Sequence, residues 1–306
     1  MTVPMMTVLG AIGWQSTWWS ILQSTFMRHA FLGGTLVAVA AGMIGYFVVI
    51  RQSAFAAHAL AHVGFPGATG AVLIGAPVIV GLAVFTIVGG LVIGALGRRV
   101  ATREVATGTI LALATALGIL FSSMASQNTR GLTNILFGNL LVISTAQLVA
   151  YAAFTALIVV VLGLVARPLL FGSIDPTVAA SRGVPVGALG IVFLVLMALV
   201  VTMAVQVVGT LLLFALVVTP AAAALRLTAR PSHVVGLATL IGVSSVWLGL
   251  VLSAMFNLPP SFPIVSLAVT VWAVVLVATG DRHRASIANV GHDGHHPRDA
   301  THGHGH

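Results

Sequence analysis

The stretch IVFLVLMALVVTMAV, residues 191–205, contains no charged side chain and consists almost entirely of apolar residues. A helix needs about 20 such residues to cross the hydrocarbon core of a bilayer, and apolar neighbours extend this run toward that length. The whole chain has the same character, with 59% hydrophobic and 6% charged residues among its 306, whereas soluble domains carry about a quarter charged residues. The sequence therefore predicts an all-α, polytopic integral membrane protein.

The hydropathy pattern predicts about nine membrane-spanning helices. They are expected near residues 30–50, 54–73, 77–97, 105–124, 147–166, 185–205, 207–225, 233–254 and 262–279. A shorter apolar piece, NILFGNLLVIS at 134–144, is about half a bilayer long, which favours a re-entrant or interfacial helix. We expect a transmembrane domain over 1–280 and a disordered, histidine-rich cytoplasmic tail over 281–306, because the tail lacks apolar periodicity.

The basic residues are 13 arginines set against five acids, which give a net charge of +8. They lie singly or in pairs between apolar runs, so they indicate the positive-inside rule rather than nucleic-acid binding. All of those beside the predicted spans except Arg28 and Arg130 fall on one side if the N-terminus is outside. This pattern predicts a multi-pass protein of the cell membrane, inner or plasma, with its C-terminus in the cytoplasm. Trp14, Trp18 and Trp19 are interpreted as anchors at the membrane surface.

The chain has no cysteine and no lysine. The first absence excludes disulfides, thiolate metal sites and cysteine nucleophiles. The second excludes a Walker A phosphate loop, whose lysine contacts the nucleotide phosphates. We therefore expect a subunit that is not itself an enzyme and has no permanently bound cofactor, with any ATP hydrolysis supplied by a partner.

The segment SAFAAHALAHVGFPGATG, residues 53–70, places His58 and His62 four residues apart in an apolar helix. This spacing puts both imidazoles on one face, where they can share a divalent metal ion. Ionisable groups within membrane helices usually face a pathway, and Gly64, Pro66 and Gly67 loosen this helix. We interpret the pair as part of a cation path; the alternative is that each imidazole only hydrogen-bonds a neighbouring helix.

The longest polar stretch between spans, RPLLFGSIDPTVAASRGVP at 167–185, carries the signals of a short helix on the cytoplasmic face. Asp175 fits its N-cap and Pro176 its first position, while Gly183 and Pro185 end it. An ordinary loop is the alternative. Glu104 is expected to cap the first turn of the fourth span, favoured there by the helix dipole.

Other polar residues near membrane depth either line a path or bridge two helices. These are Asn134, Asn139, Gln206, Thr210 and Asn257. The tail adds a histidine cluster interleaved with glycines and two aspartates, which suits weak binding of Zn²⁺, Ni²⁺ or Cu²⁺ unless it is a purification tag. The histidines are His292, His295, His296, His302, His304 and His306.

Several motifs together resemble the zinc/manganese permease subunits of bacterial ATP-binding-cassette importers. The matching pieces are RQSAFAAHALAHVGFPG, REVATGTILALATALGILF, NILFGNLLVIS, IDPTVAASRGVPV, VGTLLLFALVVTPAAAALRL and NLPPSFPIVSL. The resemblance implies two cytoplasmic ATP-binding subunits, a second permease copy and an extracytoplasmic metal-binding protein as partners. It also implies that a coupling helix docks on the ATPase through Asp175, Pro176, Ala180 and Gly183.

This chain departs from the family pattern at one position, since His58 stands where relatives usually have aspartate, while His62 matches the usual histidine. An imidazole in place of a carboxylate favours a softer ion, so the sequence predicts a zinc importer permease. A manganese or iron importer of the same family is the first alternative. A stand-alone secondary metal transporter or a metal-sensing membrane scaffold is the alternative from another class.

Overall fold

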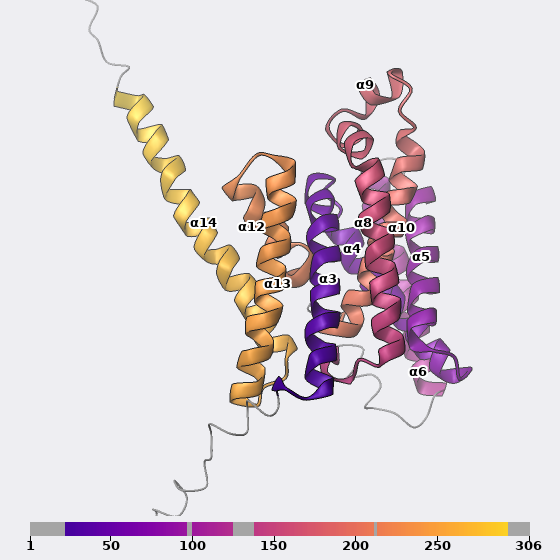
Figure 1. Ribbon diagram of the computed structural model, residues 1–306. Coiled ribbons are helices and arrows are strands. Elements are labelled where there is room, and N and C mark those ends of the chain that lie inside the picture. Colours follow the sequence, from indigo (N-terminus) through magenta and orange to yellow (C-terminus); the bar gives the residue numbers. More distant parts are fainter. Residues whose placement is uncertain (1–21, 97–99, 125–137, 211–212, 293–306) are drawn as a thin grey trace, which may run out of the picture.

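The computed structural model describes residues 22–96, 100–124, 138–210 and 213–292, and within these ranges every regular element is a helix (Figure 1). The expected all-α class is confirmed. The elements are α3 (Thr25–Ile50), α4 (Ala54–Leu73), α5 (Val78–Leu96), α6 (Val100–Met124), the 3₁₀ helix η1 (Leu140–Val142), α8 (Thr145–Ile174), α9 (Pro176–Ser181), α10 (Val186–Val208), α11 (Leu213–Val217), α12 (Thr219–Leu227), α13 (Pro231–Phe256) and α14 (Ser261–His292).

Seven helices of the described ranges are long and apolar enough to cross a membrane, namely α3, α5, α6, α8, α10, α13 and α14. The helix α4 has 20 residues but is not among the seven, because its two histidines and its glycines lower its hydropathy. A polytopic helical membrane fold is thus confirmed, and the expected count of nine spans is not.

The predicted span at 207–225 is wrong, because no single helix occupies it. The helix α10 ends at Val208, and Gly209 follows with φ of 86°, a left-handed conformation that glycine adopts without steric cost. The chain continues as the short helices α11 and α12, whose inward residues are buried. Such a break is tolerated at membrane depth because neighbouring protein, not lipid, surrounds it.

The predicted re-entrant helix at 134–144 is not formed by the described part of that segment. Residues 134–137 lie outside the described ranges, and only Leu140–Val142 forms one 3₁₀ turn. Gly138 has φ of 73°, and the Asn139 N–H donates to the Gln206 carbonyl over 3.0 Å. The segment is therefore held in a non-helical conformation against the last turn of α10.

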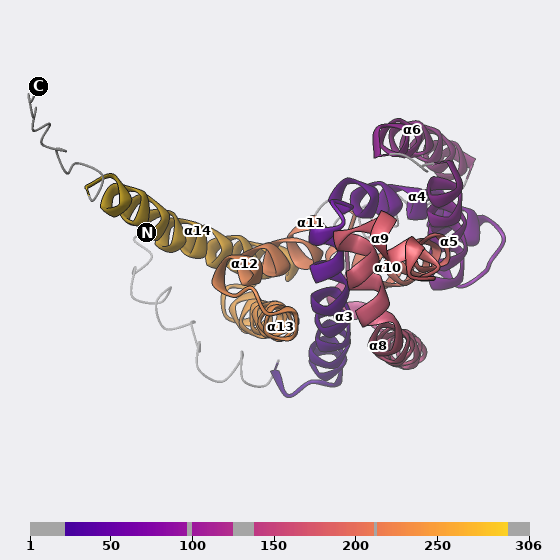
Figure 2. The ribbon, with the colours of Figure 1, turned by 90° about the horizontal axis from the view of Figure 1, so that it is seen from above.

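The helix α3 lies at the centre of the bundle (Figure 2). It packs against α13 on one side and against α8 and α10 on the other, while α4 packs against α5 and α6. The helix α14 lies at the edge, beside α12 and α13. The two most buried spans are α10 and α3, so the core is formed where they meet.

The helix α14 continues to His292, past the predicted start of the tail at residue 281. An α-helix continues from the apolar span because residues 281–292 contain no proline and only one glycine. Residues 293–306 lie outside the described ranges, and the division into a permease domain and a tail stays a prediction.

Candidate functional site

His58 and His62 lie together on one face of α4, as their spacing predicted. Their ring centroids are 4.9 Å apart with the ring planes at 75°, and both side chains are half-buried. The two rings come from the second and third turns of α4, near the end of the bundle where α3, α8 and α9 end and α10 begins (Figure 1). We call this the α9 end.

No third metal ligand completes this pair among the side chains of the described residues, where no group of three His, Cys, Asp or Glu side chains occurs. A catalytic zinc site uses three protein ligands and one open position, so the described part of the chain does not build one. Two imidazoles alone suit a weaker, passing interaction with a cation.

Pro66 lies inside α4, four residues after His62. Proline has no N–H, so the backbone carbonyl of His62 loses the donor that an α-helix normally supplies from this position. The Thr69 hydroxyl, one turn further on, donates to the Phe65 carbonyl over 3.1 Å. The hydrogen-bond pattern of the helix is therefore interrupted at the second histidine of the pair, at the point where the helix is loosened.

The short helix expected between residues 175 and 183 is confirmed as α9. Asp175 Oδ1 accepts hydrogen bonds from the backbone N–H groups of Thr177 and Val178, over 3.0 and 2.9 Å, and Pro176 occupies the first turn. Gly183 follows the helix with φ of 81°. All the residues predicted to dock on the ATPase are exposed: Asp175, Pro176, Ala180 and Gly183.

The side chain of Ala179 is fully buried, so α9 is fastened to the bundle by one face and presents the other to its surroundings. In Figure 1, α9 projects beyond the ends of α8 and α10. An exposed helix that is connected at both ends to transmembrane helices can transmit a displacement by a docked protein to the bundle.

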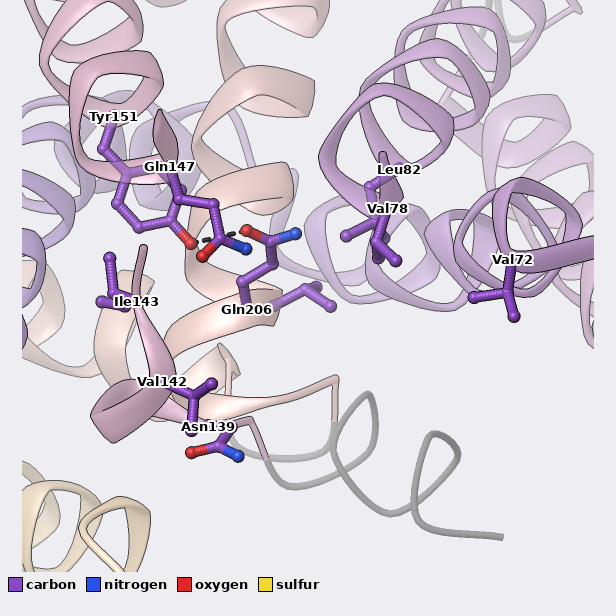
Figure 3. Close-up of a pocket in the computed structure, with 10 residues that line it drawn as sticks. Val72, Val78, Leu82, Asn139, Val142, Ile143, Gln147, Tyr151 and Gln206 are labelled. Carbon is purple, nitrogen blue, oxygen red and sulfur yellow. Dashed lines mark hydrogen bonds between the residues drawn. The ribbon is translucent and has the colours of Figure 1, made fainter. Parts of the chain in front are cut away.

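A cavity of about 250 Å³ lies toward the opposite end of the bundle, between α4, α5, α8 and α10 (Figure 3). Its lining residues are Val72, Val78, Leu82, Asn139, Val142, Ile143, Gln147, Tyr151, Val205 and Gln206. The Tyr151 hydroxyl donates to Gln206 Oε1 over 2.6 Å. About 15 Å of helix, at 1.5 Å per residue, separates Val72 at this cavity from His62.

The sequence reasoning named Gln206 and Asn139 as residues that line a path or bridge helices, and both line this cavity. It missed Tyr151 and Gln147. A signal for Gln147 exists in the pair Ser144 and Gln147, which forms a capping box at the start of α8. Nothing in the local pattern around Tyr151 points to its partner, which lies 55 residues away in the sequence.

Of the other polar residues named from the sequence, those that the structure describes do not line this cavity. Thr210 is fully buried and its hydroxyl has no hydrogen-bond partner in the described structure, while Asn257 ends α13 in a left-handed conformation with φ of 53°. Asn134 lies outside the described ranges. The expected capping by Glu104 is wrong, because α6 begins at Val100 and its first turn contains no acid.

The histidine cluster of the tail is not placed. His292 is the last residue of α14, and His295, His296, His302, His304 and His306 lie outside the described ranges. Metal binding by the tail stays a prediction.

The chain matches the model of the ABC 3 transport family over residues 23–279. Its relatives include the manganese transport system membrane protein MntC of Halalkalibacterium halodurans, 31% identical over 83% of this chain and 87% of the relative. The manganese import system permease protein ScaB of Streptococcus gordonii is 27% identical over 81% of this chain and 90% of the relative.

Among solved structures, PsaBC from Streptococcus pneumoniae in complex with Fab aligns with a TM-score of 0.76 and 26% identity. The alignment covers 85% of this chain and 94% of the other. A second structure, an inward-facing conformation of a putative metal-chelate type ABC transporter, has a TM-score of 0.65 and 16% identity. It covers 82% of this chain and 85% of the other, and shows the fold alone.

Proposed function

Since this chain belongs to the ABC-3 transport family, a family of ATP-binding-cassette metal importers, we propose that it is the permease subunit through which Mn²⁺ enters the cell. One observation carries the proposal: two imidazoles share one face of a buried helix that a proline loosens, in a chain related over more than four fifths of its length to a manganese transport protein.

The expectation of zinc is not supported, because the relatives compared above are named for manganese. The zinc prediction rested on histidine replacing a carboxylate at position 58, and that argument counted side chains only. Mn²⁺ favours oxygen ligands, and the carbonyl of His62 that Pro66 leaves without its helical donor is such an oxygen. An imidazole pair with a neighbouring carbonyl suits a cation that must bind weakly enough to move on.

We propose that the α9 end faces the cytoplasm of a cell whose plasma membrane holds the protein. Helix ends place Arg51, Arg167, Arg182 and Arg226 toward this end, and Arg28 at the other, an asymmetry that matches the positive-inside rule. The N-terminus is then outside and the C-terminus inside. The cation enters from the cavity end, passes His62 and His58, and leaves at the α9 end.

The proposed partners follow from this orientation. Two copies of a cytoplasmic ATP-binding subunit supply the energy, and each docks on an exposed α9. A second copy of this chain forms the other half of the path, and an extracytoplasmic binding protein delivers the ion at the cavity end. The family match favours this assembly over a stand-alone transporter or a sensing scaffold.

Metal uptake in competition tests the proposed function. Cells that express the chain with its ATPase and binding protein are expected to accumulate Mn²⁺ in an ATP-dependent manner, with unlabelled Mn²⁺ competing better than Zn²⁺ or Fe²⁺. Cells with the permease omitted are the control. Uptake of Zn²⁺ in preference to Mn²⁺ would overturn the manganese assignment, and no uptake of any metal would overturn the transport function.

Replacing Pro66 by alanine is expected to stabilise the protein and slow its transport. Alanine restores the N–H that bonds the His62 carbonyl. Proline inside a helix costs about 3 kcal/mol relative to alanine, so the variant should recover part of this cost as stability. Thermal unfolding in detergent should shift upward while initial Mn²⁺ uptake falls several-fold. Gly163→Ala, at an exposed position of α8 with open space around it, is the control for helix stabilisation alone. Undiminished uptake by P66A would show that the free carbonyl has no role.

A further inference from the structure

One side chain, Arg51, joins three helices at the α9 end and is not used by the proposed path. It caps the C-terminus of α3. Its Nη1 donates to the Ser173 hydroxyl of α8 over 3.0 Å, and its guanidinium lies 5.0 Å from the ring centroid of Phe193 in α10. A Cβ added to Gly190, one turn earlier in α10, would come within 3.7 Å of Arg51 Nη2, so the guanidinium lies against the surface of that helix.

The two helices that Arg51 contacts are the ones that hold α9. Ser173 lies two residues before Asp175, the N-cap of α9, and Phe193 lies in the third turn of α10, the helix that follows the α9 connection. The ring of Phe193 is 1% exposed, so it cannot turn away without disturbing the core. A displacement of α9 that moves the ends of α8 and α10 therefore acts on the guanidinium of Arg51.

The backbone of Arg51 is joined just as tightly to α4. Only Arg51, Gln52 and Ser53 separate α3 from α4, and Gln52 is in the left-handed region with φ of 50°, which a side chain other than glycine adopts only when its surroundings hold it there. The Ser53 hydroxyl donates to the Arg51 carbonyl over 3.1 Å, and the Ser53 N–H donates to the Val48 carbonyl over 2.9 Å. The turn has little freedom, so movement of Arg51 is passed to the start of α4.

We propose that Arg51 is the positioning residue through which α9 moves the imidazole pair. His58 lies about 6 Å along α4 from its first residue, at 1.5 Å per residue, so a shift at the start of α4 reaches both histidines. This inference rests on the proposed function, since it assumes that an ATPase acts on α9. It assigns to one side chain the mechanical link between the ATPase and the cation path.

Arginine suits this role better than lysine does. Its planar guanidinium can donate to Ser173 along one edge while its face lies on the Phe193 ring, and it holds this geometry rigidly. A lysine retains the charge and one of the two contacts. Replacement by alanine removes both contacts and leaves the short turn between α3 and α4 in place.

The test uses the complete complex of permease and ATPase in lipid nanodiscs and proteoliposomes. Arg51→Ala is expected to assemble with the ATPase and to hydrolyse ATP, while the amount of Mn²⁺ transported per ATP falls at least several-fold; Arg51→Lys should recover part of the loss. The matched control is Arg226→Ala, which removes an exposed arginine in the last turn of α12 at the same end. A purely structural role would lower assembly, hydrolysis and transport together and leave the ratio unchanged.

A second readout does not depend on transport. The chain contains no native cysteine, so spin labels can be attached at Phe55→Cys in α4 and Ile174→Cys at the end of α8. The native side chains at these positions are 46% and 73% exposed, respectively. In the complex with native Arg51, the distance between these labels should stay narrowly distributed when nucleotide binds. With Arg51→Ala, the distribution should broaden because α4 no longer follows α8.

These outcomes separate the inference from the proposed function. ATP-driven uptake by the native complex establishes the function on its own. An unchanged transport-to-hydrolysis ratio and an unchanged label distance in Arg51→Ala would then overturn the role of Arg51. If Arg51→Ala fails to assemble, Phe193→Leu takes its place, since it removes the ring and keeps the arginine; a native ratio in that variant would also overturn the role.

Discussion

Replacing both His58 and His62 by alanine is expected to abolish metal uptake while the complex with the ATPase still assembles. The two rings are 4.9 Å apart, and no group of three or more His, Cys, Asp or Glu side chains that could take over as a metal site occurs in the described ranges. Loss of an outer-shell partner alone lowers metal affinity by about 10- to 100-fold, so the loss of both ligands should lower uptake by more than about 10-fold.

Initial Mn²⁺ uptake and co-purification of the ATPase check this expectation. His233→Ala, which removes an exposed histidine near the start of α13, is the matched control and should transport normally. His58→Asp introduces the carboxylate that the family resemblance puts at this position, and should retain uptake with a larger preference for Mn²⁺ over Zn²⁺, because a hard oxygen ligand replaces an imidazole. Normal uptake by the double alanine variant would exclude His58 and His62 from the path.

Replacing Asp175 and Gly183 by alanine is expected to weaken docking of the ATPase and so to lower both permease-stimulated ATP hydrolysis and transport. Asp175→Ala removes both N-cap hydrogen bonds of α9, at a cost of about 1 kcal/mol. Gly183→Ala forces a side chain into the left-handed region, at a cost of about 1–2 kcal/mol. Since α9 has only six residues, the two changes together should unfold it and remove the surface proposed to dock on the ATPase.

The expected result is that permease-stimulated ATP hydrolysis and Mn²⁺ uptake both fall several-fold in proteoliposomes, with the bundle still folded by thermal unfolding. Asp175→Asn is the conservative variant, because asparagine caps a helix about as well as aspartate, and it should behave as native. Gly187→Ala is the glycine control, since Gly187 lies in α10 with open space around it and no positive φ. Native rates of stimulated ATP hydrolysis and Mn²⁺ uptake in the double variant would rule out α9 as the docking helix.

These two variants and Arg51→Ala separate successive steps of one mechanism. The α9 variant should lose stimulated hydrolysis, whereas Arg51→Ala should keep hydrolysis and lose its connection to transport. The histidine variant should keep hydrolysis and assembly and lose the ion. Three different patterns of hydrolysis and uptake are expected because the proposals assign docking, transmission and ion passage to different residues.

Much of the fold could be predicted because its signals are local. An apolar run such as residues 191–205 has only one stable arrangement in a bilayer, a helix whose backbone groups bond to each other. The α9 helix could be predicted from the sequence for the same reason. Asp175, Pro176 and Gly183 determine the backbone conformation within a few residues of their own positions. That the two imidazoles lie on one face could be predicted from the helical period alone.

Two of the errors concern positions where the backbone depends on distant partners. The predicted span 207–225 included Gly209, because a hydropathy average carries no information about the backbone φ angle. The break at Gly209 is stabilised by packing against other helices, which a hydropathy average over neighbouring residues does not detect. The segment around Asn139 was expected to be helical because it is apolar, but its N–H bonds the Gln206 carbonyl, more than 60 residues away. Zinc was expected from side chains alone, whereas the relatives compared above are named for manganese.

The sequence by itself determined the membrane class, most of the helices, the short capped helix and the shared face of His58 and His62, since each depends on composition or on spacing within one helix. Only the tertiary structure decided where those pieces meet. It places the cavity with Tyr151 and Gln206, breaks the chain at Gly209, and brings Arg51 onto Ser173 and Phe193. Contacts of this kind join residues more than 100 positions apart in the sequence, as Arg51 and Ser173 are, and they arise from how helices pack, which no local pattern encodes.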